Sequence, residues 1–290
     1  MLQTKEILKK IKKLDIKTKQ LVDGIITGNY NSVFKGQGIE FSEIRDYRAG
    51  DDIRAIDWKV TARFNHPYIK EFIEERDLQA YFIIDISGSG SFGTNISKKE
   101  KSIEIIASLM FAALRNNDGV GIFLITDTIE KFIPAKKGRK HILQLLKILT
   151  TFTPNSVKTD LKKSLEQISK IVKRKSIVFV ISDFIDNTEY LKPLKILRKR
   201  HDVIALRIAD PREREIPDVG MIELEDDETG EQILVDTSDK EFRNSYSRLI
   251  SDNESKFLSN MMKIKIDTVP LLTEQDYSIS LKKFFKRRSR

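Results

Sequence analysis

The stretch LQAYFIIDISGSGSFGT, residues 78–94, decides the fold. Its first half, LQAYFIID, is a nearly continuous apolar run, which is typical of a strand buried on both faces of a parallel sheet. The residues that follow Asp85 are rich in glycine and serine, so a loop follows the strand. Ligands of α/β proteins bind at such strand ends, which makes this loop the first candidate for a functional site.

The rest of the body repeats this alternation of strand and helix. Further apolar runs of strand length alternate with segments whose apolar residues recur at helical spacing. The predicted strands are 120–126, 175–183, 202–208 and 263–269, and the predicted helices are 98–117, 141–152, 161–173, 190–200 and 239–262. The sequence therefore predicts an α/β fold with a doubly wound, mostly parallel sheet that helices cover on both faces.

Two regions depart from this pattern. At residues 211–237, two short strand-like runs flank DETG, which predicts a β-hairpin insertion with its glycine in the left-handed conformation. The N-terminal region, 1–76, begins with an amphipathic, lysine-rich helical pattern and then becomes densely charged. We therefore expect an N-terminal extension at 1–76, an α/β domain at 77–272 and a basic C-terminal tail at 273–290.

The charged block RDYRAGDDIRAIDWKVTAR, residues 45–63, alternates aspartate with arginine. A metal site, as in a nuclease, is disfavoured because the guanidinium groups would compete with a cation for the same carboxylates. Bidentate Arg–Asp pairing around Trp58 is the better account. We expect this network to dock the N-terminal region against the α/β domain, and a contact surface for a partner is the alternative.

Composition and charge exclude several classes of protein. The chain has no cysteine, and its three histidines lie far apart, so disulfides, thiol nucleophiles and histidine-rich zinc sites are excluded. No apolar stretch is long enough to span a bilayer and no signal peptide is evident, so we expect a cytoplasmic protein. The net charge of +9 is concentrated at 1–20 and 281–290, which argues against nucleic-acid binding by the body. These ends and Phe284–Phe285 suggest weak contact with anionic membrane surfaces.

The loop DISGSGSFGT at 85–94 matches two incompatible motifs. Its glycines spell G-x-G-x-x-G, which binds a dinucleotide, whereas its first five residues spell D-x-S-x-S, which suits a hard divalent cation. The carboxylate of Asp85 would repel a pyrophosphate, and Asp127, which ends the next strand, lies too far along the chain for the ribose contact. No Gly-Lys-Ser/Thr follows, so a Walker A loop is excluded as well. The cation is the better ligand.

A cation site needs further oxygen ligands from other strand ends. We predict a weakly bound Mg²⁺ or Mn²⁺ with retained waters and one open position, because few protein ligands are available. The alternative is that the aspartates only cap helices and the serines only form the loop. The predicted metal ligands are Asp85, Ser87, Ser89, Thr159 and Asp183.

This arrangement resembles the metal-ion-dependent adhesion site of von Willebrand factor A domains, in which D-x-S-x-S is followed by a threonine and then an aspartate. The upstream segment GQGIEFSEIRDYRAGDDIRAIDWKVTARFNHPYIKEFIEERD, 36–77, resembles the signature of the bacterial "domain of unknown function 58" family. The resemblance implies a von Willebrand factor A-like fold and a metal-dependent, protein-binding adaptor in which a partner's carboxylate completes the metal coordination. It also implies a MoxR-type AAA+ ATPase and other A-domain proteins as partners.

An enzymatic function has little support in the sequence. No Ser/His/Asp arrangement is visible, and Asp85 resembles the nucleophile of aspartyl-phosphate phosphatases only in part. Those enzymes carry a second aspartate two residues later, where this chain has Ser87, so the general acid is missing. We therefore predict that the protein is not an enzyme. The alternatives are a Mg²⁺-dependent, phosphatase-like hydrolase and a protein that associates with membranes or nucleic acid through its basic ends.

Overall fold

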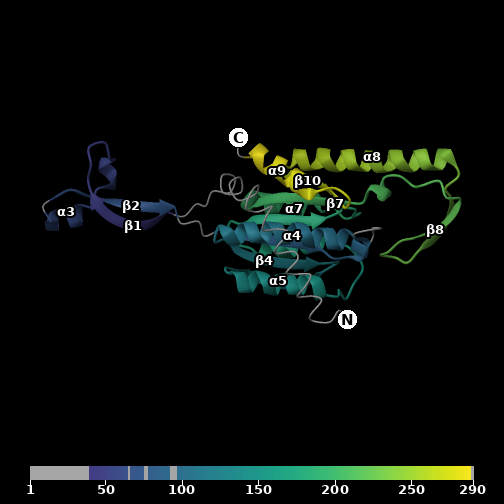
Figure 1. The fold of residues 1–290 in the computed structure, drawn as a ribbon, viewed down its shortest axis with the longest axis horizontal. Coiled ribbons are helices and arrows are strands. Elements are labelled where there is room, and N and C mark those ends of the chain that lie inside the picture. Colours follow the sequence, from purple (N-terminus) through teal and green to yellow (C-terminus); the bar gives the residue numbers. More distant parts are fainter. Residues whose placement is uncertain (1–38, 65, 75–77, 92–96, 289–290) are drawn as a thin grey trace.

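The computed structural model describes residues 39–64, 66–74, 78–91 and 97–288, so the helix expected near the N-terminus lies outside the described residues. Its centre is a six-stranded sheet with the strand order β10-β7-β6-β3-β4-β5. Neighbouring strands run parallel except β4 and β5, which are antiparallel (Figure 1). The strands are β3 (Gln79–Asp85), β4 (Gly119–Ile125), β5 (Ile129–Lys136), β6 (Ile177–Ser182), β7 (Asp202–Ala209) and β10 (Asp267–Leu272).

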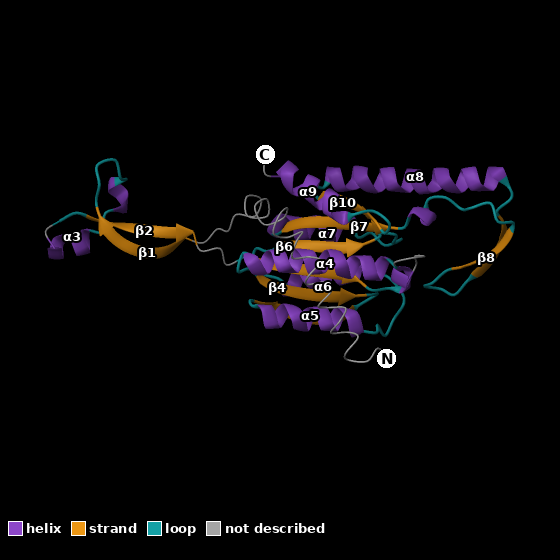
Figure 2. Ribbon diagram, in the orientation of Figure 1, coloured by secondary structure: helices purple, strands orange, loops and turns teal. Residues whose placement is uncertain are grey.

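Helices cover both faces of this sheet (Figure 2). Alternate residues of β3 enter opposite cores: Phe82 packs with helices α4, α5 and α9, whereas Ile83 packs with α6, α7 and α8. The helices are α4 (Lys98–Arg115), α5 (Arg139–Thr151), α6 (Leu161–Ile171), α7 (Leu191–Arg200), α8 (Lys240–Lys263) and α9 (Tyr277–Arg288). The predicted doubly wound α/β fold is confirmed.

The strand order reverses direction beside β3. From β3 the chain passes through α4 to β4 on one side, whereas β6 pairs with β3 on the other side. The crevice at the carboxyl ends of β3 and β6 is therefore the topological switch point, where doubly wound sheets bind their ligands. Asp85 ends one of these strands and Asp183 follows the other.

The edge strand β5 was not predicted. Its sequence, IEKFIPAK, mixes charged and apolar residues and contains Pro134, which lacks the N–H that a central strand needs. Both features are tolerated because β5 has a neighbour on only one side.

The segment expected as a basic C-terminal tail is instead a helix of the body, α9. Leu281, Phe284 and Phe285 are each at most 4% exposed. They belong to the hydrophobic core that also includes buried side chains of α4 and β10. The basic residue Arg288 pairs with carboxylates of the sheet, at 2.7 Å from Asp202. The two phenylalanines are therefore unavailable for the lipid contact suggested by the sequence. Among the described helices, none has both the length and the apolarity required to cross a membrane.

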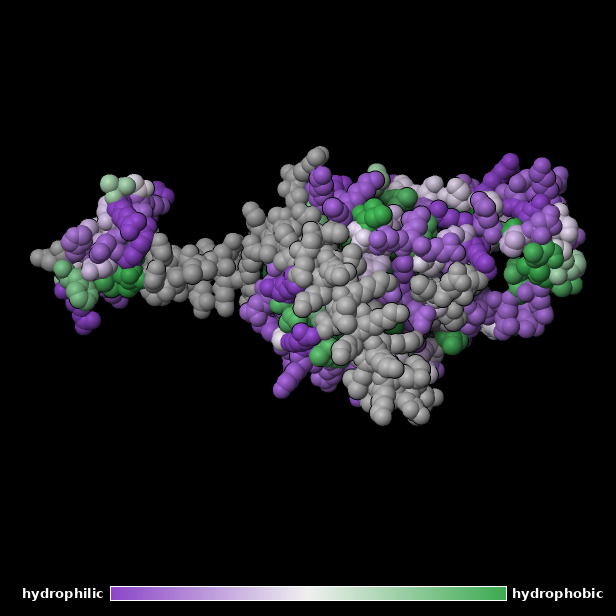
Figure 3. Space-filling view, viewed as in Figure 1, coloured by the Kyte–Doolittle hydropathy of each residue, from purple (hydrophilic) through white to green (hydrophobic). Residues whose placement is uncertain are grey.

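The predicted hairpin insertion is present. Strands β8 (Met221–Glu225) and β9 (Gln232–Asp236) pair antiparallel, and Gly230 in their turn has a φ of 71°, the left-handed conformation that glycine adopts readily. Before it lies a short 3₁₀ turn, η4 (Pro211–Glu213), which Asp210 caps. Apolar hairpin side chains face solvent at the β8 end of the molecule, where Met221, Ile233 and Leu234 are each more than half exposed (Figure 3).

The charged block forms the end of the first strand of a small separate sheet and most of the connection to the second strand. Strands β1 (Ile39–Asp46) and β2 (Tyr68–Glu74) pair antiparallel, and η2 (Ile53–Ala55) and α3 (Trp58–Phe64) connect them. Arg45 donates two hydrogen bonds to Asp51, at 2.8 and 2.9 Å, so bidentate pairing is present at this one pair of the block. Trp58 is 66% exposed, so this pair does not enclose the tryptophan as expected. Docking of the block against the large sheet stays a prediction.

Candidate functional site

The first half of the candidate site is the loop that follows β3. Asp85 is the last residue of the strand, and its Oδ1 accepts a hydrogen bond from the backbone N–H of Ser87 at 3.1 Å. This contact folds the loop back, and the hydroxyl oxygens of Ser87 and Ser89 then lie 3.4 Å apart. The D-x-S-x-S motif therefore presents a carboxylate and two hydroxyls at one strand end.

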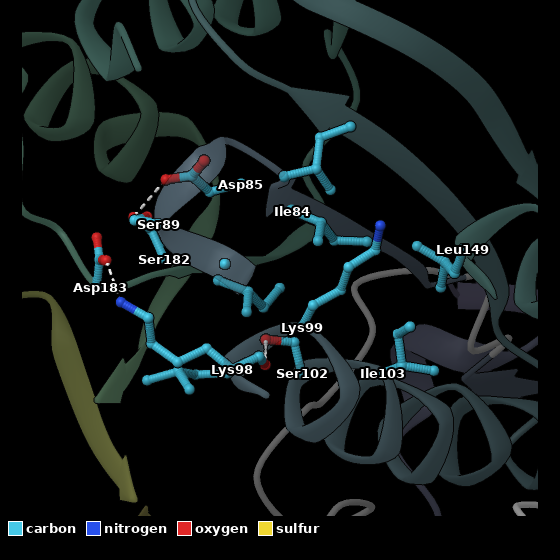
Figure 4. Close-up of a pocket in the computed structure, with 14 residues that line it drawn as sticks. Ile84, Asp85, Ser89, Lys98, Lys99, Ser102, Ile103, Leu149, Ser182 and Asp183 are labelled. Carbon is cyan, nitrogen blue, oxygen red and sulfur yellow. Dashed lines mark hydrogen bonds and ion pairs between the residues drawn. The ribbon is translucent and has the colours of Figure 1, made fainter. Parts of the chain in front are cut away.

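The second half follows β6. Ser182 ends that strand and donates its hydroxyl proton to Oδ2 of Asp85 at 2.8 Å, which joins the two strand ends (Figure 4). Asp183 follows directly, and its Oδ1 accepts from the backbone N–H of Ile185 at 3.1 Å. The structure thus brings the loop of β3 and Asp183 together at the switch point. A pocket is open between them, and its polar lining residues include Asp85, Ser89, Lys98, Lys99, Ser182 and Asp183.

A buried lysine neutralises Asp183. Lys98, the first residue of α4, places its Nζ 2.8 Å from Oδ2 of Asp183 (Figure 4). The same Nζ lies 2.6 Å from Oε1 of Glu213. Burial would lower the pKa of Lys98, but the charges of the two carboxylates outweigh it, so the net pKa is raised and the side chain is an ammonium at neutral pH. Glu213 reaches this position from the capped turn η4.

Among the described residues, Asp85 has no such counterion. Burial and, secondly, the charge of Asp183 raise its pKa to about 6, against the opposing effect of the hydrogen bonds from Ser87 and Ser182. Lys98 therefore balances the negative charge of Asp183, whereas no described basic side chain balances that of Asp85.

Thr159 lies on an adjacent loop but faces a different partner. The N–H of Gly88 donates to the carbonyl of Val157 at 2.9 Å, which ties the two loops together. The hydroxyl of Thr159, however, donates to Oε1 of Glu228 at 2.5 Å, and its backbone N–H donates to Oε2 at 3.2 Å. Glu228 belongs to the turn between β8 and β9, so the hairpin insertion reaches the candidate site.

Gly88 permits this close approach of the hairpin. A Cβ at this position would lie 2.6 Å from the carbonyl oxygen of Asp227, a distance at which the backbone would have to move. The first glycine of the apparent dinucleotide motif is thus needed for contact with the chain's own hairpin.

The residues present fit a weakly held hard cation. The two carboxylates repel each other across the switch point, and hydroxyl oxygens stand beside Asp85, a donor set of the type that Mg²⁺ accepts. Across the described part of the chain, no group of three or more His, Cys, Asp or Glu side chains could hold a metal ion. The serine hydroxyls and retained waters must therefore provide most of the ligands.

Sequence reasoning missed four residues of this cluster. Ser182 had a signal, since it directly precedes Asp183 at the same strand end. The other three had none, because they reach the site from an α-helix, a 3₁₀ turn and a hairpin that pattern alone does not place there. They are Lys98, Glu213 and Glu228.

Comparison with known proteins gives relatives along almost the whole chain. Uncharacterized proteins of Mycobacterium tuberculosis (Rv1480) and Mycobacterium bovis (Mb1516) are each 28% identical over 283 residues, which cover 97% of this chain and 89% of the relative. The protein YeaD of Bacillus subtilis is 28% identical over 108 residues, 37% of this chain and 25% of its own.

Two solved structures each align with 73% of the chain. BatB from Bacteroides thetaiotaomicron, a conserved hypothetical protein, aligns with a TM-score of 0.49 at 15% identity, over 73% of this chain and 98% of its own. An aerotolerance-related membrane protein from Bacteroides fragilis aligns with a TM-score of 0.49 at 16% identity, with the same coverage.

The family model described as "Protein of unknown function DUF58" matches residues 43–256. This match runs from the charged block through both strand ends of the candidate site and the hairpin into α8. It covers well over half of the chain. The chain therefore belongs to the DUF58 family.

Proposed function

We propose that the chain is a non-enzymatic adaptor that binds a partner protein through a divalent cation, Mg²⁺ or Mn²⁺. The observation that carries this proposal is the meeting of two strand ends at the switch point, where Asp85 and Asp183 lie close enough for the charge of one to raise the pKa of the other. A cation between them would relieve this repulsion, and hydroxyl oxygens stand ready beside Asp85.

In this proposal, Asp85, Ser87 and Ser89 hold the cation from one strand end, and Asp183 and Thr159 contribute from the neighbouring loops. The cation supplies a directional bond to a carboxylate oxygen of the partner, which replaces a bound water. Such a bond is short-range, whereas an exposed salt bridge contributes about 0–1 kcal/mol and weakens with salt.

The polar groups of the site favour binding over catalysis. Lys98, the buried one of the two lysines that line the pocket, is held between Asp183 and Glu213 and is therefore a poor proton acceptor. No histidine is among the described residues that line the pocket. Ser87 occupies the place at which a phosphatase would need a carboxylic acid.

A MoxR-type AAA+ ATPase is the partner that we propose, on the basis of the resemblance stated above, and the process served would be the assembly or maturation of other proteins. The test is co-purification of the wild-type chain and of Asp85→Ala with such an ATPase, in the absence of nucleotide, with Mg²⁺ or with EDTA.

Asp127→Ala is the matched control, because Asp127 follows β4 at the same edge of the sheet and forms hydrogen bonds with Ser156 and Thr126, not with Asp85 or Asp183. We expect EDTA and Asp85→Ala to abolish the complex and Asp127→Ala to preserve it. A complex that survives both EDTA and Asp85→Ala would show that the cation does not mediate binding.

A further inference from the structure

The hairpin β8–β9 has one fully exposed face, on which apolar and acidic side chains lie opposite each other. Residues that pair across two antiparallel strands share a face, and here Met221 pairs with Asp236 and Glu223 pairs with Leu234. All four are exposed, Met221 to 59% and Leu234 to 68%. Neither hydrophobic core of the described chain includes a residue of these strands. The described part of the body therefore leaves this face open to solvent (Figure 3).

The hairpin is also strongly acidic. Residues 221–236 contain seven aspartates and glutamates and no lysine or arginine. Two copies of this face would repel each other, and an anionic lipid surface would be repelled as well. The exposed face therefore fits a partner surface on which apolar side chains lie among basic ones.

The charged block at 45–63 provides a surface of this kind. Three large apolar side chains of η2 and α3 are each at least 64% exposed: Ile53, Trp58 and Phe64. Three basic residues next to them in the sequence are exposed as well: Arg54, Lys59 and Arg63. Exposed aromatic and arginine side chains are the residues that contribute most to protein–protein interfaces.

The aspartates of the block already serve contacts inside it. Asp51 is paired with an arginine, as described above. The Oδ1 of Asp52 accepts a hydrogen bond from the backbone N–H of Arg54 at 2.9 Å, and the Oδ1 of Asp57 accepts one from the N–H of Lys59 at 3.0 Å. These carboxylates shape η2 and the start of α3, while the neighbouring basic side chains stay exposed. The block therefore presents a basic and apolar surface to solvent.

The connections of the chain favour contact between two copies. The block is joined through β2 and residues 75–77 to the amino end of β3. The turn of the hairpin lies beyond the carboxyl end of the same strand, where Asp227 approaches Gly88. Within one chain, the block would have to fold back along the full length of β3 to reach the hairpin. A second copy can bring the two surfaces together without that rearrangement.

We propose that the charged block of one chain binds the exposed face of the hairpin β8–β9 in a second copy of the chain. Trp58 and its apolar neighbours cover Met221 and Leu234, and the basic side chains of the block pair with the acidic side chains of the hairpin. Because the two surfaces differ, the contact is head to tail, and each end of a dimer keeps one unused surface through which the assembly can grow. This association needs no cation and is independent of the proposed function.

The test is sedimentation velocity of the full chain in EDTA, over a range of protein concentrations and at low and high sodium chloride. The variants are Trp58→Ser in the block and Leu234→Ser in the hairpin. Ile279→Ser is the matched control, because Ile279 lies on α9 and is 68% exposed, as Leu234 is. All three side chains are exposed, so each variant should fold, and its melting temperature checks this.

We expect the wild type and Ile279→Ser to associate alike as their concentration rises, and more weakly at high salt. Trp58→Ser should weaken the association about thirtyfold, as is typical of a tryptophan at the centre of an interface, and Leu234→Ser should weaken it too.

An equimolar mixture of Trp58→Ser and Leu234→Ser decides whether the contact is head to tail. The first variant keeps an intact hairpin and the second an intact block, so the mixture should form dimers with the affinity of the wild type, and nothing larger. A wild type that stays monomeric up to its limit of solubility would overturn the proposal. So would an association that Trp58→Ser leaves unchanged, or a mixture that associates no more than either variant alone.

Discussion

The charged block at 45–63 and the cluster at the carboxyl ends of β3 and β6 both pair basic with acidic side chains, but they do so in different environments. In the block, Arg45 and Asp51 lie six residues apart and retain 28% and 21% of their side-chain exposure. In the cluster, Lys98 and Asp183 lie 85 residues apart, and each is 5% exposed. The first pair organises a local turn, whereas the second joins helix α4 to the end of β6.

This difference in solvent exposure determines how much each pair can contribute to the free energy of unfolding. The Arg45 guanidinium lowers the pKa of Asp51 to about 2, yet water screens an exposed pair and limits its effect on stability. A buried pair is costly to form, but removing one partner leaves the other charge buried and unpaired. The cluster should therefore dominate stability, and Asp85, for which the described residues supply no counterion, should dominate binding.

The largest effect should follow from Lys98→Met. This change leaves Asp183 and Glu213 without their ammonium, so the free energy of unfolding should fall by about 3–5 kcal/mol. Urea denaturation in EDTA measures this loss, with Lys99→Met, a change at an exposed neighbour, as the control.

The Lys98→Met variant should also bind Mn²⁺ more tightly than the wild type, since the cation no longer competes with Lys98 for Asp183. Equal stability of the two lysine variants would contradict the comparison.

A smaller effect of opposite sign should follow from Asp85→Asn. Because the folded-state pKa of Asp85 is about 6, above its ordinary value of 3.8, ionisation of this group destabilises the native protein above about pH 6. In EDTA at pH 8, the variant should be more stable than the wild type, by on the order of 1 kcal/mol. The gain should vanish as the pH falls from 6 towards 4, where the wild-type carboxyl becomes protonated. A variant less stable than the wild type at pH 8 would mean that Asp85 is well neutralised without a cation.

The smallest effect should follow from Arg45→Ala. Loss of an exposed, bidentate pair should lower the melting temperature only slightly, and the difference from the wild type should shrink as sodium chloride is added. Melting curves at low and high salt test this. A loss as large as that of Lys98→Met would show that the block is part of a buried interface, as the docking prediction requires.

Much of the fold could be predicted because its signals are local. The central strands are continuous apolar runs, and DETG with Gly230 marks the hairpin turn. In α9 the helical spacing of Leu281, Phe284 and Phe285 was present, but the surrounding lysines and arginines favoured a tail. The edge strand β5 gave no such signal, because an edge tolerates charge and Pro134.

The candidate site could be predicted only in part, for a related reason. Asp85 and Asp183 were found because each ends a predicted strand, and parallel strands end at one edge of the sheet. Their partners come from distant parts of the chain: Glu213 lies 115 residues from Lys98, and Glu228 lies 69 residues from Thr159. Which loop meets which across a sheet depends on tertiary packing, and no spacing in the sequence encodes it.

The central claim is that Asp85 and Asp183 hold a divalent cation, and thermal unfolding at increasing Mn²⁺ tests it most directly. A cation that binds only the folded chain stabilises it by about 2.7 kcal/mol at a hundredfold excess over its dissociation constant. We predict that Mn²⁺ raises the melting temperature of the wild type and of Asp127→Ala above their values in EDTA, and leaves Asp85→Ala and Asp183→Ala unchanged. An equal rise in all four proteins, or none in the wild type, would contradict the claim.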